Sequence, residues 1–232
     1  MPGESQARAD AAAGPRCAPV DTRSAAALAS MLGELNVSVS GLVSPLMHRA
    51  LAQAGARGEP GVIALVATVG GEPAGFVVAT RDSGRFWPRL LLRHPTLAIR
   101  VLLSRRRQRG AASPTGAAAG GATAEDADPT LRFPPASQAA HAWADDGPSI
   151  VKIIFIGVRP AFRQRGVGDL LYRRLFEEAA MRGAHAVLAR IARDNAASIR
   201  LHEAAGWQLY RDSTGILAVR PVSTPRSQST PA

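Results

Sequence analysis

The chain is short of cysteine and of long apolar runs. Cys17 is the only cysteine among 232 residues, which excludes an intrachain disulfide and a cysteine-based zinc cluster. No apolar run approaches the roughly 20 residues that a membrane-spanning helix needs. The first sixteen residues also lack the apolar core of a secretory signal. We therefore expect a cytoplasmic protein.

Lysine is almost absent. Lys152 is the only lysine, so nearly all of the 28 basic residues are arginine, and the formal net charge is +10. Heavy use of alanine, glycine, proline and arginine indicates compositional bias, which weakens any single surface arginine as a functional clue. The charge is concentrated, however, because residues 81–109 hold nine arginines and one acid, Asp82. This stretch leaves open a weak contact with an anionic membrane or an acidic partner, whereas nucleic acid binding has little other support.

The histidines give no sign of a metal site. His48, His94, His141 and His185 have no mutual spacing that is typical of metal ligands, so we expect no metal. The length suits one domain, which we place at residues 16–220. Residues 1–15 and 221–232 are predicted to be disordered tails. An inserted segment is predicted at about 82–148, and the Ala/Gly/Thr/Ser-rich composition of residues 110–129 is that of a flexible linker.

Periodicity and turn residues predict an alternation of strands and helices. Strands are predicted at 16–20, 61–69, 74–80, 150–158, 185–191, 207–210 and 215–219. Helices are predicted from 21 or 22 to 32, from 45 to 54, after the glycines at 166 and 168, and from 195 to 205, with two short helices around Pro95. Ser44 is the expected cap of the second helix, and residues 70–73 are the expected turn of a hairpin.

One stretch, residues 158–169, stands between a predicted buried strand and a strongly periodic helical segment. Pro160 ends the strand, and Gly166 and Gly168 lie where a loop becomes a helix. The N-terminus of a helix exposes unpaired N–H groups and partial positive charge, and glycine lets an anion approach closely. Arg163 and Arg165 add attraction. A plain glycine-rich turn is the alternative, and neither a P-loop nor a dinucleotide fingerprint fits.

This stretch resembles the acyl-CoA-binding signature of the GNAT N-acetyltransferase superfamily, whose core is Arg/Gln-x-x-Gly-x-Gly/Ala. A second block, residues 195–207, resembles the family's later Asn…Leu-Tyr-Glu…Gly-Phe segment at matching spacing. The clear resemblance covers residues 150–219, with a weaker match at 17–80. It implies an α/β (α+β) domain with a mixed, mostly antiparallel sheet of about seven strands, flanked by helices on both faces. The two central parallel strands should splay apart to admit the cofactor.

The resemblance also implies a function. The family transfers an acetyl group from acetyl-CoA to an amine acceptor by direct attack in a ternary complex. The acceptor can be a small molecule or a peptide, and both a monomer and a homodimer stay open. By the resemblance, the residues that would bind the cofactor are Ile156, Gly157, Val158, Arg163, Gln164, Arg165, Gly166, Val167, Gly168, Asp169, Asn195 and Ser198.

The sequence departs from the family at its usual general acid, a tyrosine, where this chain has His202. An unperturbed histidine has a pKa near 6.5 and is mostly neutral at pH 7, so His202 is either the acid or a structural residue. Tyr210 and Tyr172 are weaker substitutes, because the first lies in a predicted strand and the second on a predicted helix surface. Asn195 can equally be a helix cap. No general base can be named.

Two other classes of function therefore stay open. A catalytically silent acyl-CoA-binding or regulatory module would explain the missing tyrosine, and a basic peripheral protein would explain residues 81–109. The insertion joins the third and fourth strands, where the family's acceptor cleft opens. It is either a lid over that cleft or a helical addition that packs on the domain.

Overall fold

The computed structural model describes residues 14–35, 45–81, 83–99, 103, 150–212 and 215–222. The strands are β1 Arg16–Pro19, β2 Val62–Val69, β3 Glu72–Thr80, β4 Ile150–Val158, β5 Ala186–Ile191, β6 Gln208–Asp212 and β7 Gly215–Pro221. They form one sheet in the order β1-β2-β3-β4-β5-β7-β6, in which only β4 and β5 are parallel neighbours. The predicted mixed, mostly antiparallel sheet is confirmed.

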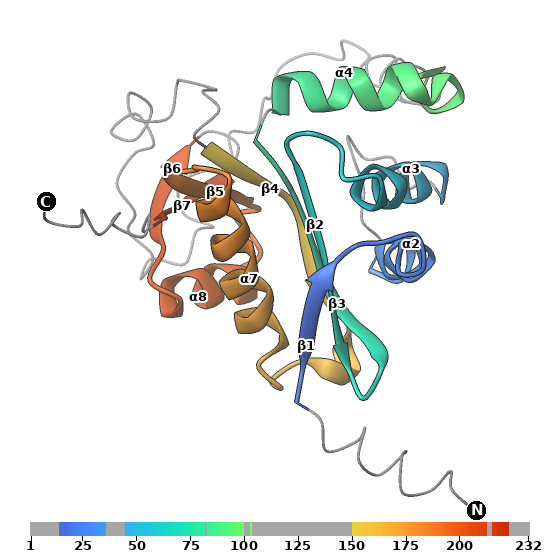
Figure 1. Ribbon diagram of the computed structural model, residues 1–232. Helices are drawn as coiled ribbons and strands as arrows, with labels where there is room; N and C mark the ends of the chain where they lie inside the picture. The colour runs from blue at the N-terminus through green and yellow to red at the C-terminus, as the bar shows by residue number, and fades with distance from the viewer. Residues whose placement is uncertain are drawn as a thin grey trace, which may run out of the picture.

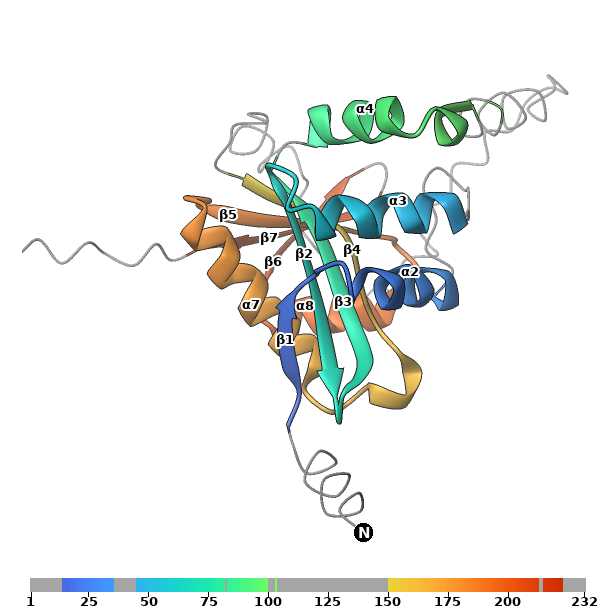
Figure 2. The ribbon, with the colours of Figure 1, turned by 45° about the vertical axis from the view of Figure 1, so that its right-hand side comes forward.

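Helices cover both faces of this sheet, as predicted (Figures 1 and 2). On one face lie α2 Ala25–Glu34, α3 Pro45–Ala56 and α4 Ser83–Arg93. On the other lie α7 Val167–Met181 and α8 Ala196–Ala204. The sheet separates two apolar clusters, one around Phe76, Leu51 and Leu32, the other around Val77 and Leu171. No helix in the described ranges is long and apolar enough to cross a membrane.

The β2–β3 hairpin follows from its turn residues. Gly70 and Gly71 have φ values of 58° and 82°. A two-residue hairpin turn of this hand needs positive φ at both positions, which glycine adopts without steric cost. The predicted turn at 70–73 is thus shorter than expected, because Glu72 and Pro73 already belong to β3 and pair with Val69 and Thr68.

The helix starts show where local side chains compete with the helix. The first helix begins at Ala25, later than predicted, because Asp21 and Ser24 close a turn ahead of it. The Ser24 N–H donates to Asp21 Oδ1 at 2.7 Å, and the Asp21 N–H donates to Ser24 Oγ at 2.9 Å. Helix α3 begins at Pro45 as predicted. Ser44, its expected cap, lies outside the described residues.

The first part of the insertion packs as part of the domain. Helix α4 and the helical residues 95–99 are separated at His94, which agrees with two short helices around Pro95. Phe86, Leu90 and Leu97 are buried in the cluster that contains α2 and α3. The predicted linker at 110–129 and both predicted tails, except for residues 14, 15, 221 and 222, lie outside the described residues.

The two parallel strands at the centre of the sheet separate after a short contact. Strand β4 pairs with β5 only at Ile150, Val151 and Lys152, although it pairs with β3 from Lys152 to Val158. Beyond Lys152, no strand of the described chain pairs with the edge of β4 that faces β5. The expected splay is therefore present, and the turn that follows β4 lies at its open end.

Candidate active site

The turn between β4 and α7 has an unusual backbone. A short 3₁₀ helix, Pro160–Phe162, follows β4, and Gln164 and Gly166 then adopt left-handed φ values of 60° and 71°. Gln164 is the only described residue other than glycine with positive φ. Gly166 is the N-cap of α7 and provides no side chain to cap it. Alternation of left-handed residues in such a turn directs successive N–H groups toward one side.

These N–H groups have no acceptor within the described chain. The first backbone bond of the helix joins the Leu170 N–H to the Gly166 carbonyl at 3.0 Å, and no hydrogen bond within the described residues engages the N–H groups of residues 164–169. A Cβ atom added at Gly166 or Gly168 would meet no described heavy atom within 4 Å. The helix N-terminus therefore opens onto free space, which is the arrangement that binds phosphate in proteins.

The side chains of the turn add charge of both signs. Arg163 and Arg165 are exposed; Arg163 Nε donates to the Val158 carbonyl at 3.3 Å, and the Arg165 guanidinium lies 5.7 Å from the ring centre of Phe162. Asp169 is exposed in the first turn of α7, where its charge favours the helix dipole. The structure thus places the predicted residues 163–166 in the turn and residues 167–169 in the first turn of α7.

The end of β4 lies next to this turn, and Gly157 explains how closely it packs. A Cβ at Gly157 would come within 2.6 Å of Leu35 Cδ1 and 3.3 Å of the Phe76 ring. Only glycine therefore fits while the end of α2 covers this point. Ile156 and Val158 pack against the cluster on the opposite face. The backbone of Ile156, Gly157 and Val158 belongs to the strand whose edge toward β5 has no partner strand among the described residues.

Asn195 caps α8. Its side-chain oxygen accepts a hydrogen bond from the Ser198 N–H at 3.0 Å, and the residue is exposed. The capping role suggested by the sequence is therefore present. Contact of Asn195 and Ser198 with a cofactor stays a prediction.

His202 is buried, with 1% of its surface exposed. Its Nδ1 lies 2.7 Å from the Ser198 carbonyl oxygen, and because a carbonyl only accepts, Nδ1 carries the proton. Nε2 lies 2.9 Å from the Tyr172 hydroxyl and accepts its hydrogen bond. Burial lowers the pKa of His202 below its usual value, and the bond to the Ser198 carbonyl offsets this only in part. His202 is therefore neutral at pH 7.

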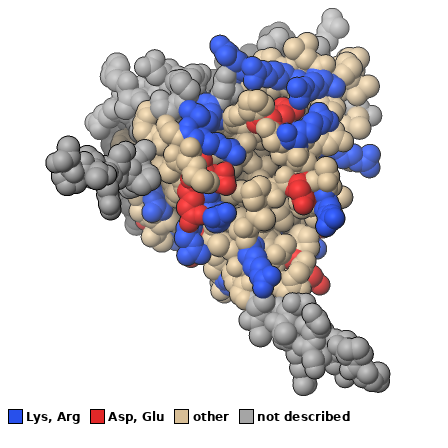
Figure 3. Space-filling model, in the orientation of Figure 1, with Lys and Arg blue, Asp and Glu red and all other residues tan. Residues whose placement is uncertain are grey.

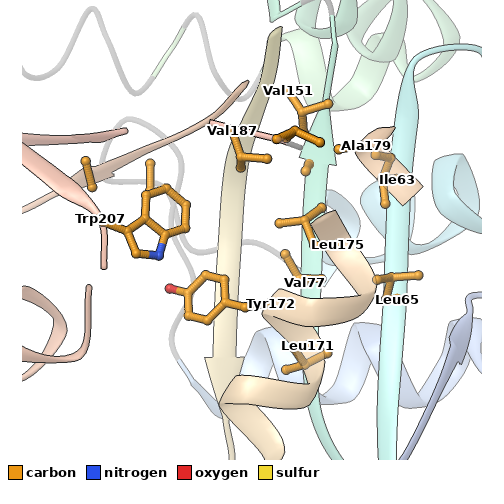
Figure 4. Packing of buried hydrophobic residues seen from close by; sticks show 14 of the residues in the cluster. Ile63, Leu65, Val77, Val151, Leu171, Tyr172, Leu175, Ala179, Val187 and Trp207 are labelled. Atoms are coloured by element: carbon orange, nitrogen blue, oxygen red, sulfur yellow. The ribbon is translucent and has the colours of Figure 1, made fainter. Parts of the chain in front are cut away.

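Tyr172 is not on a helix surface, contrary to the interpretation of the sequence. It is only 3% exposed, because α8 and Trp207 cover the side of α7 on which it lies. Figure 4 shows its ring reaching from α7 toward Trp207. Burial first, and then the charge of Asp169, raise the pKa of Tyr172, so its hydroxyl keeps its proton at neutral pH. The Tyr172 hydroxyl is thus the hydrogen-bond partner of His202, which stands where the family usually has its tyrosine.

Sequence reasoning also missed an ion pair that connects three segments. Arg159 Nε lies 2.8 Å from Glu34 Oε2 at the end of α2, and Arg159 Nη1 donates to the Pro73 carbonyl at 3.1 Å. The pair links α2, the start of β3 and the turn before α7. Arg159 lies within the recognised motif, but no local pattern marks Glu34, because its partner is remote in the sequence.

Two cavities flank these residues. One, of about 650 Å³, lies between α2 and α3, and Glu34 and His48 line it. The other, of about 980 Å³, runs along α7, where Asp169, Tyr172 and Phe176 line it together with Arg220. No group of three or more metal-ligating side chains occurs in the part of the chain that the structure describes.

The described strands thus form a seven-stranded sheet that splays at its one parallel pair, and a turn with unbonded N–H groups lies at the opening. The sequence matches the profile of the Acetyltransferase (GNAT) family over residues 34–207. The chain therefore belongs to the GNAT acetyltransferase family. No curated protein matches the sequence significantly.

Solved structures agree in fold. The chain is similar to yncA from Salmonella typhimurium, solved with its cofactor acetyl-CoA, at 18% identity and a TM-score of 0.52, with 95% of this chain and 99% of that chain covered. It is similar to a GNAT-family acetyltransferase from Streptococcus pneumoniae at 13% identity and a TM-score of 0.53, with 90% of this chain and 99% of that chain covered. It is also similar to NAA60 from Arabidopsis thaliana, solved in complex with acetyl-CoA, at 12% identity and a TM-score of 0.51, with 90% of this chain and 98% of that chain covered. Identities this low establish the fold alone.

Proposed function

We propose that the protein is an acetyl-CoA-dependent N-acetyltransferase, which transfers the acetyl group to an amine acceptor by direct attack in a ternary complex. Family membership supports the acetyl transfer, and two of the similar structures hold acetyl-CoA. The observation that carries the proposal is the row of N–H groups at residues 164–169, which have no acceptor in the described chain and lie beside the open edge of β4. The acceptor is a small molecule or a peptide, and a cytoplasmic location stays a prediction.

The residues present fit acetyl-CoA. The N–H groups of Gln164, Arg165, Gly166, Val167, Gly168 and Asp169 would hold its pyrophosphate, with Arg163 and Arg165 attracting the charge. The backbone of Ile156, Gly157 and Val158 would pair with its pantetheine arm, and Asn195 and Ser198 would contact that arm from α8. When bound, acetyl-CoA supplies the activated acetyl group as a thioester.

The chain must then manage two protons. The acceptor nitrogen bonds to the acetyl carbon while the carbon–sulfur bond breaks, so the nitrogen loses a proton and the leaving sulfur gains one. His202, the predicted acid, donates its only proton to the Ser198 carbonyl, whereas Tyr172 keeps a hydroxyl proton beside it. We therefore assign the donor to the His202–Tyr172 pair, with the hydroxyl turning from Nε2 toward the sulfur. The proton of the amine passes to water, and water returns a proton to the Tyr172 oxygen before the next turnover.

The cofactor part of the proposal is tested by two matched glycines. Gly166 and Gly183 lie at opposite ends of α7, both have φ of 71°, and a Cβ at either meets no described atom within 4 Å. Gly166→Glu and Gly183→Glu therefore impose the same backbone strain and the same charge. In calorimetric titrations with acetyl-CoA, only Gly166→Glu should lose binding. Equal affinity of the two folded variants would show that the turn is not the phosphate site.

A second experiment separates the enzyme from a silent acyl-CoA-binding module. The protein is incubated with acetyl-CoA and a panel of amines, amino sugars and peptides, and release of the free thiol is followed. An N-acetyltransferase releases thiol only when an acceptor is present. Tight acetyl-CoA binding without thiol release for any acceptor would instead favour the module, and the panel also identifies the acceptor class.

A further inference from the structure

The last turn of α2 is weak on local grounds. The body of the helix is fixed by Leu28, Met31 and Leu32, which are buried in the cluster on this face of the sheet. The last turn contains Gly33, which lowers helix stability, and it has no basic residue. Glu34 places a negative charge at the C-terminus of the helix, where the helix dipole disfavours it. The position of this helix end therefore depends on a partner from elsewhere in the chain.

Arg159 is that partner. Its Nε lies 2.8 Å from Glu34 Oε2, and Ser30 Oγ donates to the other carboxylate oxygen of Glu34 at 3.2 Å. The guanidinium supplies the positive charge that the end of α2 lacks. Arg159 is itself fixed, because its N–H donates to the Ala74 carbonyl at 2.9 Å and its Nη1 donates to the Pro73 carbonyl at 3.1 Å. The arginine is thus the fixed member of the pair, and the helix end is the part that it positions.

The pair adds little to the stability of the whole domain. Figure 3 shows acidic side chains next to basic ones at several places on the surface, so an ion pair alone is no sign of function. The side chains of Arg159 and Glu34 are 33% and 44% exposed, and exposed pairs gain little because water screens their charges. The pair Arg174–Glu177 has similar exposure but lies within one helix. Glu34–Arg159 instead joins two remote segments at the end of β4.

This pair holds Leu35 against β4. A Cβ at Gly157 would lie 2.6 Å from Leu35 Cδ1, so the end of α2 covers this face of the strand closely. Helix α7 fills the opposite face, because a Cβ at Gly75, in the neighbouring strand, would lie 3.1 Å from Val167 Cγ1 and 3.2 Å from Leu171 Cδ1. Figure 2 shows α2 and α7 on opposite sides of the sheet. Of the described elements, the end of α2 therefore borders the side from which an acceptor can reach the edge of β4.

We propose that Arg159 and Glu34 are positioning residues for the acceptor. The fixed arginine holds the last turn of α2 in place, so that Leu35 borders the path of the acceptor to the acetyl group. The pair acts through the position of the helix end and not through contact with the reacting atoms. This inference rests on the proposed function, but it concerns the acceptor side, because Glu34 contacts none of the N–H groups of residues 164–169 in the described structure.

Hydrogen exchange in the free protein tests the positioning without any acceptor. The Leu35 N–H donates to the Met31 carbonyl at the end of α2, and the Leu28 N–H donates within the body of the helix. In Arg159→Gln, exchange at Leu35 should be roughly 5-fold faster than in the parent, with Leu28 unchanged. Adding Glu34→Gln should return the Leu35 rate toward that of the parent, because it removes the unpaired charge from the helix end. A loss of the Pro73 bond alone would give no such return.

Steady-state kinetics tests the consequence for the acceptor. With acetyl-CoA and the amine that gives the fastest thiol release, Arg159→Gln and Glu34→Gln should each lower kcat/KM for that amine roughly 5- to 100-fold, chiefly through KM. Calorimetry should show unchanged acetyl-CoA affinity. Glu177→Gln is the matched control, because it breaks a pair whose side chains are 37% and 46% exposed, and it should behave as the parent does.

The outcomes separate this inference from the proposed function. Thermal melts check that each variant is folded. Parent-like exchange at Leu35 in Arg159→Gln would overturn the inference and leave the proposed function standing. Parent-like acceptor kinetics in both single variants, or an equal loss in Glu177→Gln, would do the same. If the parent released no thiol with any acceptor, the proposed function would fail, and the inference would fail with it.

Discussion

The ring of His202 joins two helices through both of its nitrogen atoms. It donates to the Ser198 carbonyl within α8 and accepts from the Tyr172 hydroxyl on α7, and Trp207 lies against it with ring centres 4.8 Å apart. A second ring proton would reverse the bond to the Tyr172 hydroxyl, with Nε2 donating, and would bury a positive charge; burial is therefore what favours the neutral imidazole. A buried residue of this kind couples protonation to folding.

Protonation of His202 should therefore destabilise the fold in acid. Burial lowers the pKa of His202 in the folded state, so in acid the unfolded chain binds more protons than the folded one. The stability that the neutral His202 contributes is therefore lost as the pH falls below about 6.5, the usual pKa of histidine in an unfolded chain. Between pH 7.5 and 5.5 the free energy of unfolding should fall further in the parent than in His202→Gln, by up to about 1.4 kcal/mol, the most that protonation of the unfolded histidine can supply. Urea denaturation at both pH values measures this, with exposed His185→Gln as the control. An identical pH slope in the parent and in His202→Gln would contradict it.

The hydroxyl of Tyr172 should matter for the reaction itself. Tyr172→Phe should lower kcat roughly 10- to 1,000-fold with little change in acetyl-CoA affinity, because it removes the assigned proton donor. Tyr210→Phe is the control, since the Tyr210 hydroxyl bonds only to Gln208 in the described structure.

The pH profile then separates the two members of the pair. If the tyrosine hydroxyl donates, the kcat of the parent should be flat between pH 6 and 9. If His202 itself were the acid, kcat would decline with rising pH from below pH 6.5, because its pKa is lowered. Unchanged turnover in both Tyr172→Phe and His202→Phe would leave the pair with a structural role alone.

At the scale of elements, α4 is the part of the insertion that belongs to the core. It carries a buried leucine, Leu90, and an exposed one, Leu92, two positions apart, which provides a matched comparison. Leu90→Ala should lower the free energy of unfolding by roughly 2 to 5 kcal/mol, whereas Leu92→Ala should change it by no more than about 0.5 kcal/mol. Chemical denaturation of the two variants measures this. Equal small effects would mean that α4 is not packed on the domain.

The sequence predicted elements best where a single physical signal decided them. Strand β4 has the bounds 150–158 that were expected, because a β-branched run ends at a proline. The start of α2 was missed because the Asp21–Ser24 turn uses the same residue types as a helix cap. Tyr172 was misplaced because the covering Trp207 comes from a remote segment, and the Glu34–Arg159 pair gave no signal for the same reason. Packing between distant segments is not encoded in local periodicity.

At the scale of the whole molecule, the sheet consists of two parts. Strands β1 to β4 form one antiparallel part, and β5 to β7 form the other. Only the three-residue parallel contact from Ile150 to Lys152 pairs their backbones, and α7 packs on strands of both parts. A molecule that paired with the open edge of β4 and with the start of α7 would therefore add contacts at the weakest junction of the fold.

Acetyl-CoA should consequently raise the thermal stability of the entire chain. A ligand that binds only the folded state at 100 times its Kd stabilises it by about 2.7 kcal/mol, which corresponds to a rise in Tm of roughly 5 to 10 °C for a domain of this size. The shift should be absent in Gly166→Glu and retained in Gly183→Glu. It should appear as one transition, because the ligand touches both sides of the splay. If acetyl-CoA split the melt into two transitions, the two parts of the sheet would unfold separately, and the ligand would bind one of them without bridging the opening.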